Sequence, residues 1–214
     1  MLKISKLINS PLFTGGRVRR YSGLHLVEPE SLSDHTYETV LMSLLIYKDL
    51  ERLNLNHLVD KGSMLEKALL HDLDESVMGD IPRTVKYADL RLKPVLDDVS
   101  IRYINSLTEP FDISIESEFL SCKDGSYEGK ILKVVDLVLV ARKAIRELDL
   151  KNNREFLIVV DEVNQYLAEL KFNLNDNIEH YLNHLVEDTR YTCSKVLESH
   201  HAVDKAYLVR RKGI

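Results

Sequence analysis

Residues 63–72 read Ser-Met-Leu-Glu-Lys-Ala-Leu-Leu-His-Asp, and this stretch decides the fold class. Ser63 is followed three residues later by Glu66, a capping-box pattern that predicts a helix beginning near Met64. Apolar residues then follow at helical spacing to the end of the stretch. Residues 79–82 read Gly-Asp-Ile-Pro and predict a break, because Gly favours a helix end and Pro cannot continue a helix.

Helical spacing of apolar residues recurs on both sides of this stretch. Ser33 or Asp34 can cap a helix whose apolar side chains run from Tyr37 to Tyr47. Residues 14–29 contain three glycines and a proline, which predicts a loop with about one turn of helix. No strand-type alternation competes, so the sequence predicts an all-α fold. Further helices are expected over residues 95–107, 113–120, 130–148, 154–172 and 177–199.

Length and composition limit the class of protein. The chain has 214 residues, enough for one domain with a sizeable core, and its formal net charge is −5. This charge argues against a nucleic-acid polymer as partner, because proteins that coat nucleic acid carry a basic face. The apolar run at residues 134–141 is too short to cross a membrane, and the N-terminus lacks the apolar core of a signal peptide. Cys122 and Cys193 form no CxxC pair, and so few cysteines are typical of a reducing compartment. Together, these features predict a cytoplasmic location without a membrane partner.

Asp136 is the most informative single residue, because apolar residues surround it. On a helix, its face-sharing neighbours are Leu132, Leu139 and Val140. An ionised carboxylate among such side chains is unfavourable unless a cation or several hydrogen-bond donors meet it. A metal ligand and a buried Asp that caps a helix or pairs with an Arg are about equally favoured by this pattern alone.

Two further positions could share a metal ion with this carboxylate. The pair His71-Asp72 ends an apolar helix, and an imidazole beside a carboxylate suits a borderline divalent ion. His35 stands in the first turn of an earlier apolar helix. Each position alone has a plain structural explanation, such as a polar helix end or a surface histidine. Together they come from three helices, and a helical bundle can bring such side chains to one ion.

Other polar groups give weaker signals. His180 and His184 have the i, i+4 spacing of zinc-binding pairs, but no accompanying general base is present, which favours a solvated helix face. Arg17, Arg19 and Arg20 form a basic cluster that could clamp a phosphate, although such clusters are most often solvated. The sequence contains no glycine-rich phosphate loop of the Walker type.

Residues 71–87 read His-Asp-Leu-Asp-Glu-Ser-Val-Met-Gly-Asp-Ile-Pro-Arg-Thr-Val-Lys-Tyr. The order His…His-Asp…Asp on helices resembles the HD-domain metal-dependent phosphohydrolase superfamily. The Glu after the His-Asp pair, the Gly-Asp-hydrophobe-Pro segment and the Val-Lys-Tyr resemble the bacterial HD-domain 5'-deoxynucleotidases. The resemblance implies one HD-type helical bundle over residues 1–214. Its metal-site core would span about residues 6–148, and a helical extension about residues 149–214.

Four residues match the metal ligands of that family. The resemblance therefore implies a metal site made of His35, His71, Asp72 and Asp136. The divalent ion could be Mn, Co, Fe, Ni or Zn, because imidazole and carboxylate ligands suit all of them.

Four other residues match catalytic and substrate-binding positions. Glu75 matches the acid that assists water attack or protonates the leaving group, and Asp80 matches an acid that contacts the sugar side of the nucleotide. Arg20 falls where the family has a phosphate-binding Arg, and Tyr21 stands where the family has Trp. If the helix continues past His71, Glu75 four residues later shares its metal-facing side.

The resemblance implies an enzyme that removes phosphate from (deoxy)nucleoside 5'-monophosphates and works as a homodimer. Arg20 would neutralise phosphate charge, Glu75 would handle the proton, and Tyr21 and Asp80 would hold base and sugar. A deoxynucleoside triphosphate triphosphohydrolase on the same site is one alternative, and it would release triphosphate. A non-catalytic HD module that binds nucleotide without turnover is another. A nuclease is disfavoured, because the chain is acidic and lacks an extended basic, aromatic groove.

Overall fold

The computed structural model describes residues 4–8, 10–86, 88–151, 155–174 and 177–211. Over these ranges the chain forms α- and 3-10 helices and no strand, although an isolated antiparallel bridge joins Arg19 to Ser31. The predicted all-α fold class is therefore confirmed.

The chain divides into two compact units, each formed from two segments of the sequence. The first unit comprises Met1–Leu24 and Pro29–Leu132, and the second comprises His25–Glu28 and Lys133–Ile214. The second unit thus contains a four-residue piece of the N-terminal loop besides the C-terminal helices.

Helix α2 (Leu32–Arg52) of the first unit begins with a complete capping box. The Ser31 hydroxyl accepts a hydrogen bond from the Asp34 backbone N–H, and the Asp34 carboxylate accepts one from the Ser31 N–H. The predicted caps, Ser33 or Asp34, are therefore wrong, because Ser31 satisfies the free amides of the first turn two residues earlier. The buried face of α2 includes His35.

Helix α3 (Lys61–Leu70) packs along α2. Its N-cap is Asp60, whose carboxylate accepts a hydrogen bond from the Ser63 backbone N–H, so the predicted start near Met64 is three residues late. The helix ends at Leu70 rather than running through Asp72. A turn follows, and helix α4 (Glu75–Met78) begins after it.

The predicted break at residues 79–82 is present. Gly79 ends α4 with φ of +76°, a left-handed conformation that side chains with a Cβ rarely adopt. The short helices of this unit connect or precede the long ones: α1 (Ile4–Leu7), η1 (Pro11–Phe13), η2 (Gly15–Arg17), η3 (Asn56–Leu58), α5 (Arg83–Lys86) and η4 (Glu109–Phe111). The turn of helix expected in residues 14–29 corresponds to η2.

Two further helices complete the first unit, and both are close to expectation. Helix α6 (Leu92–Thr108) includes the predicted range 95–107, and α7 (Glu116–Ser121) is shorter than the predicted 113–120 at its start. A small buried cluster of Ala68, Cys122 and Leu132 joins α3 to the segments after α7. Since Ala68 lies three residues before His71, this cluster helps to fix the end of α3.

Helix α8 (Tyr127–Asp149) is one continuous helix whose first six residues belong to the first unit and whose remainder belongs to the second. It replaces the predicted helix over 130–148. Asp136 lies four residues after Leu132, one helical turn beyond the boundary between the units.

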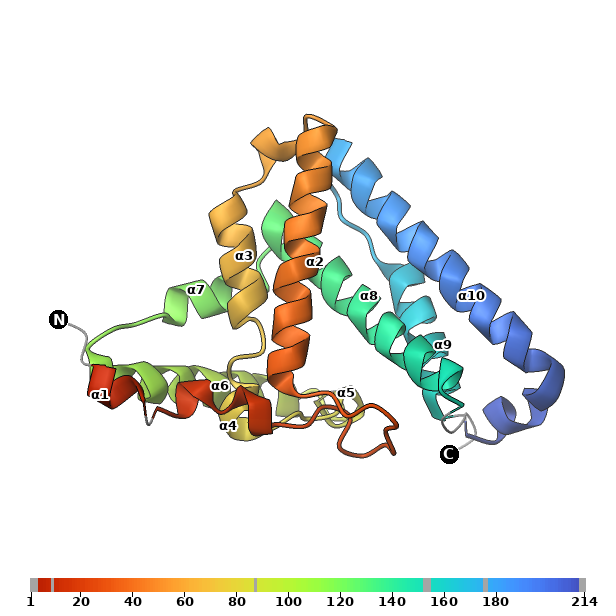
Figure 1. Ribbon diagram of the computed structural model, residues 1–214, viewed down its shortest axis with the longest axis horizontal. Coiled ribbons are helices and arrows are strands. Elements are labelled where there is room, and N and C mark those ends of the chain that lie inside the picture. Colours follow the sequence, from red (N-terminus) through yellow and green to blue (C-terminus); the bar gives the residue numbers. More distant parts are fainter. Residues whose placement is uncertain (1–3, 9, 87, 152–154, 175–176, 212–214) are drawn as a thin grey trace. The chain divides into compact units, whose positions relative to one another are not determined.

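The second unit also contains α9 (Glu155–Glu169) and α10 (Asn177–Arg211), which pack side by side (Figure 1). Helix α9 ends three residues before the predicted end at Phe172, and the predicted start, Arg154, lies outside the described residues. Helix α10 extends beyond its predicted end at Ser199. None of the helices in the described ranges is both long and apolar enough to cross a membrane.

Each unit contains one buried cysteine, Cys122 in the first and Cys193 in the second. Burial raises the pKa of both thiols to about 11. Both side chains are therefore neutral thiols near pH 7, and neither is positioned as a nucleophile.

Candidate metal centre and active site

Two imidazoles meet inside the first unit. His35 lies in the first turn of α2, and His71 follows the last residue of α3. Their Nε2 atoms are 3.2 Å apart, and the side chains are only 2% and 5% exposed. Two nitrogens that each ligate one ion at about 2.0–2.1 Å lie roughly 3.0–3.4 Å apart, so this spacing fits two ligands of one metal.

A backbone hydrogen bond fixes the protonation of His71. Its Nδ1 lies 3.0 Å from the carbonyl oxygen of Ala68. Since a carbonyl can only accept, Nδ1 carries the proton, and in the neutral ring the lone pair is on Nε2. The last turn of α3 therefore leaves the Nε2 nitrogen of His71 with a lone pair that can bind a metal ion.

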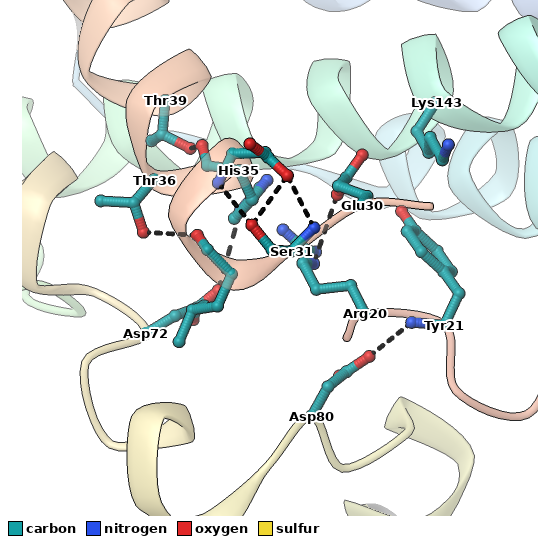
Figure 2. Close-up of polar contacts among 12 residues, drawn as sticks. Arg20, Tyr21, Glu30, Ser31, His35, Thr36, Thr39, Asp72, Asp80 and Lys143 are labelled. Atoms are coloured by element: carbon teal, nitrogen blue, oxygen red, sulfur yellow. Dashed lines mark hydrogen bonds and ion pairs between the residues drawn. The ribbon is translucent and has the colours of Figure 1, made fainter. Parts of the chain in front are cut away.

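The Asp72 carboxylate joins the two imidazoles. Its Oδ2 lies 3.2 Å from Nε2 of His71. The same oxygen lies 3.7 Å from Nε2 of His35 (Figure 2). Burial alone would raise the pKa of Asp72, but His71, Arg20 and His35 outweigh it and hold that pKa well below its usual range. The first unit thus brings together two imidazole nitrogens and an ionised carboxylate, a donor set suited to a borderline divalent ion.

Asp136 is a partly buried residue of α8. Asp136 belongs to the second unit, and His35 and His71 belong to the first; all three are residue types that can ligate a divalent metal ion. The residue types fit such an ion, because a carboxylate among apolar neighbours needs a cation or donors.

Glu75 is placed by a turn rather than by a continuing helix. Helix α3 ends before His71, and Glu75 is the first residue of α4, so the expected i, i+4 relation within one helix is wrong. The side chain is nevertheless buried, with 6% of its surface exposed.

The protonation of Glu75 reflects its surroundings. Burial, and after it the charge of Asp72, raise the pKa of Glu75 to about 8 against the opposing effect of Lys86. The Lys86 Nζ donates to the Glu75 Oε1 over 3.0 Å, and the two groups form an ion pair. For Lys86, burial would lower the pKa, but Glu75 outweighs it and the pKa is raised. A carboxyl that titrates near neutral pH can both take up and release a proton there.

A small cavity adjoins this pair. Its volume is about 40 Å³, which accommodates water but not a nucleoside. Glu75 and Lys86 line it together with the Asp74 and Ser100 side chains, which hydrogen-bond to each other across 2.5 Å. The cavity leaves room for water beside the Glu75 carboxyl.

Arg20 is held close to the same region by Glu30. Its side chain is 10% exposed, its Nε lies 3.6 Å from the Glu30 Oε1, and its backbone N–H donates to the Glu30 carbonyl (Figure 2). The guanidinium also lies over the Tyr21 ring, 5.6 Å from its centroid. Arg20 is therefore not part of a solvated surface cluster.

Tyr21 adopts a left-handed backbone conformation with φ of +56°, which is uncommon for a residue with a side chain. Its backbone N–H donates to the Asp80 Oδ2 over 2.8 Å, and Figure 2 shows the Asp80 carboxylate pointing at this nitrogen. Asp80 was expected beside the sugar. In the structure its carboxylate binds the backbone that presents the Tyr21 ring.

Two partners of the site were missed in the sequence. Glu30 pairs with Arg20, and Lys86 pairs with Glu75. The first pair spans ten residues through a loop, and no periodic signal marks it. Of the quoted Val-Lys-Tyr, Tyr87 lies outside the described residues.

Comparison with known proteins gives consistent results. The profile of the family described as 5'-deoxynucleotidase YfbR-like matches residues 16–189. A 5'-deoxynucleotidase of Vibrio parahaemolyticus is 23% identical over 172 residues, covering 78% of this chain and 85% of that protein. A 5'-deoxynucleotidase of Danio rerio is 29% identical over 123 residues, covering 52% of each chain.

Solved structures share the fold. An HD-domain phosphohydrolase of Listeria innocua superposes with a TM-score of 0.69 at 20% identity, over 92% of this chain and 98% of that one. A cyanophage S-2L HD phosphohydrolase, solved with dA and one catalytic Zn²⁺ ion, superposes with a TM-score of 0.56 at 14% identity, over 88% of this chain and 95% of that one.

Proposed function

The chain belongs to the YfbR-like 5'-deoxynucleotidases, and on that premise we propose that it removes the phosphate from (deoxy)nucleoside 5'-monophosphates with the help of a divalent metal ion. One observation carries the proposal most directly. The Nε2 atoms of His35 and His71 and the carboxylate of Asp72 converge within 3.2–3.7 Å of one another, beside the buried acid Glu75.

The metal ligands in this proposal are His35, His71, Asp72 and Asp136. Asp136 is included because its partly buried carboxylate, among apolar residues of α8, needs a cation or hydrogen-bond donors. A bound divalent ion supplies Lewis acidity toward a phosphate oxygen and lowers the pKa of water. Mn, Co, Fe, Ni and Zn all suit two imidazoles and two carboxylates.

Arg20 and Glu75 are the proposed catalytic residues of the chain itself. A guanidinium can donate two parallel hydrogen bonds to phosphate oxygens, and Glu30 keeps that of Arg20 in place until substrate competes for it. Glu75 takes a proton from the attacking water or gives one to the leaving O5' oxygen. Lys86 supports the ionised form of Glu75 and thereby its action as a base.

Tyr21 and Asp80 are the proposed determinants of nucleoside binding. The Tyr21 ring offers a flat surface for the base or sugar, and the Asp80 carboxylate holds the Tyr21 backbone in its left-handed conformation. Asp80 would then act on the substrate chiefly by positioning Tyr21, in addition to any direct contact with the sugar.

The remaining expectations are part of the same proposal. The protein would act in the cytoplasm as a homodimer, with a small nucleotide as substrate and neither a nucleic-acid polymer nor a membrane as partner. Both structural units would serve one functional domain over residues 1–214, because α8 belongs to both.

The test is product analysis on purified protein, by chromatography and a phosphate assay. Deoxy- and ribonucleoside mono- and triphosphates are supplied with Mn, Co, Zn or chelator. We expect orthophosphate and nucleoside from monophosphates, no product with chelator, and no product from Asp72→Ala. Release of triphosphate from deoxynucleoside triphosphates would support the proposed metal site but show that the substrate is a triphosphate rather than a monophosphate. Turnover and metal binding that survive Asp72→Ala would refute the proposed metal site.

A further inference from the structure

A buried ion pair in the second unit has no part in the site described so far. Lys143 and Glu147 lie one turn apart on α8, with Nζ and Oε1 separated by 2.7 Å. They are 5% and 0% exposed. Two charges this deeply buried are unfavourable unless their hydrogen-bonding capacity is also used.

Backbone groups of the N-terminal loop supply that capacity. The Glu147 carboxylate accepts hydrogen bonds from the backbone N–H groups of Val27 and Glu28, at 2.8 and 3.0 Å. The Lys143 Nζ donates to the Glu28 carbonyl oxygen. We call the side chains of Lys143 and Glu147 the loop clamp, because together they hold both donors and an acceptor of a two-residue segment.

The loop clamp is a costly way to obtain stability alone. Well-packed apolar residues in place of a buried ion pair are often as stable or more so. What apolar residues cannot do is bind two amides and a carbonyl, and so fix the backbone of residues 27–28. The contacts therefore indicate that the conformation of this loop is important.

The clamped segment lies in the middle of the loop that carries the proposed substrate-binding residues. Tyr21 stands six residues before Val27, and Glu30, the partner of Arg20, stands two residues after Glu28. The N-terminal end of this loop is tied by the Tyr21–Asp80 bond and its C-terminal end by the Arg20–Glu30 backbone bond. The loop clamp adds a third tie between those two.

From this arrangement we propose that Lys143 and Glu147 are positioning residues for the nucleoside: the loop clamp sets the loop that presents Tyr21. The inference rests on the proposed function. Lys143 lies seven residues after Asp136 and Glu147 eleven, two and about three turns along the same face of α8. One helix thus carries both a proposed metal ligand and the loop clamp.

Loss of the loop clamp should weaken nucleoside binding and leave the cleavage of the phosphate ester itself unchanged. Binding of the nucleoside depends on the Tyr21 loop, whereas p-nitrophenyl phosphate has no nucleoside to bind. In Glu147→Gln we expect KM for deoxynucleoside monophosphates to rise about tenfold or more, because small misplacements of a binding group are costly. The kcat for p-nitrophenyl phosphate should stay within about twofold. Exposed Glu162→Gln on α9 is the matched control and should change neither value.

A second variant guards against simple misfolding. Lys143→Met combined with Glu147→Leu removes both charges while keeping side-chain volume, so we expect a folded protein with the same rise in KM. Amide hydrogen exchange at Val27 and Glu28 should accelerate in both variants and not in Glu162→Gln. Folded variants with faster exchange but an unchanged KM would overturn the inference, as would unchanged exchange.

The outcome for the proposed function can be distinguished from the outcome for the loop clamp. Wild-type protein that cleaves p-nitrophenyl phosphate but no nucleotide would refute the proposed function. The affinity of dAMP for chelator-treated protein, measured by calorimetry, still tests the loop clamp in that case. A weaker affinity in Glu147→Gln than in Glu162→Gln supports it, and equal affinities refute it.

Discussion

At the scale of a single residue, Glu75 is buried, forms an ion pair with Lys86, and has its pKa raised by the negative charge of Asp72. We expect Glu75→Gln to lower kcat by about 10²–10⁴-fold, the usual contribution of a general acid or base. KM should change little, because the amide keeps the size of the side chain. Phosphate release under saturating substrate measures the effect. Exposed Glu66→Gln on α3 is the control, and a similar loss in both variants would argue against a catalytic role.

The same carboxyl predicts how stability depends on pH. In the folded, metal-free protein the pKa of Glu75 is about 8, against a usual 4.5. Between these values the native state holds a proton that the unfolded state has released, so stability falls as pH rises from about 4.5 to 8. Thermal unfolding in chelator should show a Tm that falls more between pH 5 and pH 8 for wild type than for Glu75→Gln. Parallel Tm changes in the two proteins would contradict the assignment.

Site residues could be predicted from the sequence where a polar or charged side chain stands among apolar neighbours. The contacts that these side chains make could not. An Asp or a His-Asp pair among apolar residues can be recognised in the sequence alone. The structure brings His35, His71 and Asp72 together. The contact of Asp80 with the Tyr21 backbone has no such signal, because an aspartate after glycine in a turn looks the same whether or not it binds a distant amide.

The cap of α2 matters at the scale of the element, because His35 is only four residues after Ser31. Ser31→Ala removes the hydroxyl that accepts the Asp34 amide, and we expect a loss of about 1 kcal/mol in the free energy of unfolding. Exposed Ser33→Ala tests the cap predicted from the sequence and should change stability by less than about 0.5 kcal/mol. Urea denaturation of both variants gives the comparison. A larger loss in Ser33→Ala would show that the wrong serine has been identified.

Helix existence was predicted better than helix ends, for a physical reason. Ser, Thr, Asp and Asn can all cap, and several stand before each apolar run. The choice of Asp60 over Ser63 depends on which amides are free once the element packs. The break between α3 and α4 was missed in the same way, since residues 71–74 have no Gly or Pro to announce a turn.

Metal binding acts at the scale of the whole molecule, because a ligand of the native state raises the free energy of unfolding. Mn, Co or Zn at about 100 times its Kd should stabilise the protein by about 2.7 kcal/mol. The rise in Tm should be lost in His71→Ala and retained in His180→Ala, whose histidine is exposed on α10. Loss of the rise in His180→Ala alone would move the metal site to that helix.

The division into two units was not foreseen. Helix α8 continues through the boundary at Leu132 and Lys133 without Gly, Pro or a change in apolar spacing. The assignment of residues 25–28 to the second unit depends on side-chain bonds from Glu147 and Lys143 to a distant loop. Periodicity describes a helix by itself and carries no information about such long-range bonds.

The two buried cysteines can serve as natural probes of how fast each unit opens. A thiol-specific alkylating reagent reacts with thiolate that solvent can reach, so Cys122 and Cys193 stay unmodified until their surroundings open. Mass spectrometry can time the alkylation of each one separately. Equal rates would mean that the two units open as one cooperative body. A faster rate at one cysteine would identify the unit that opens first, without any engineered label.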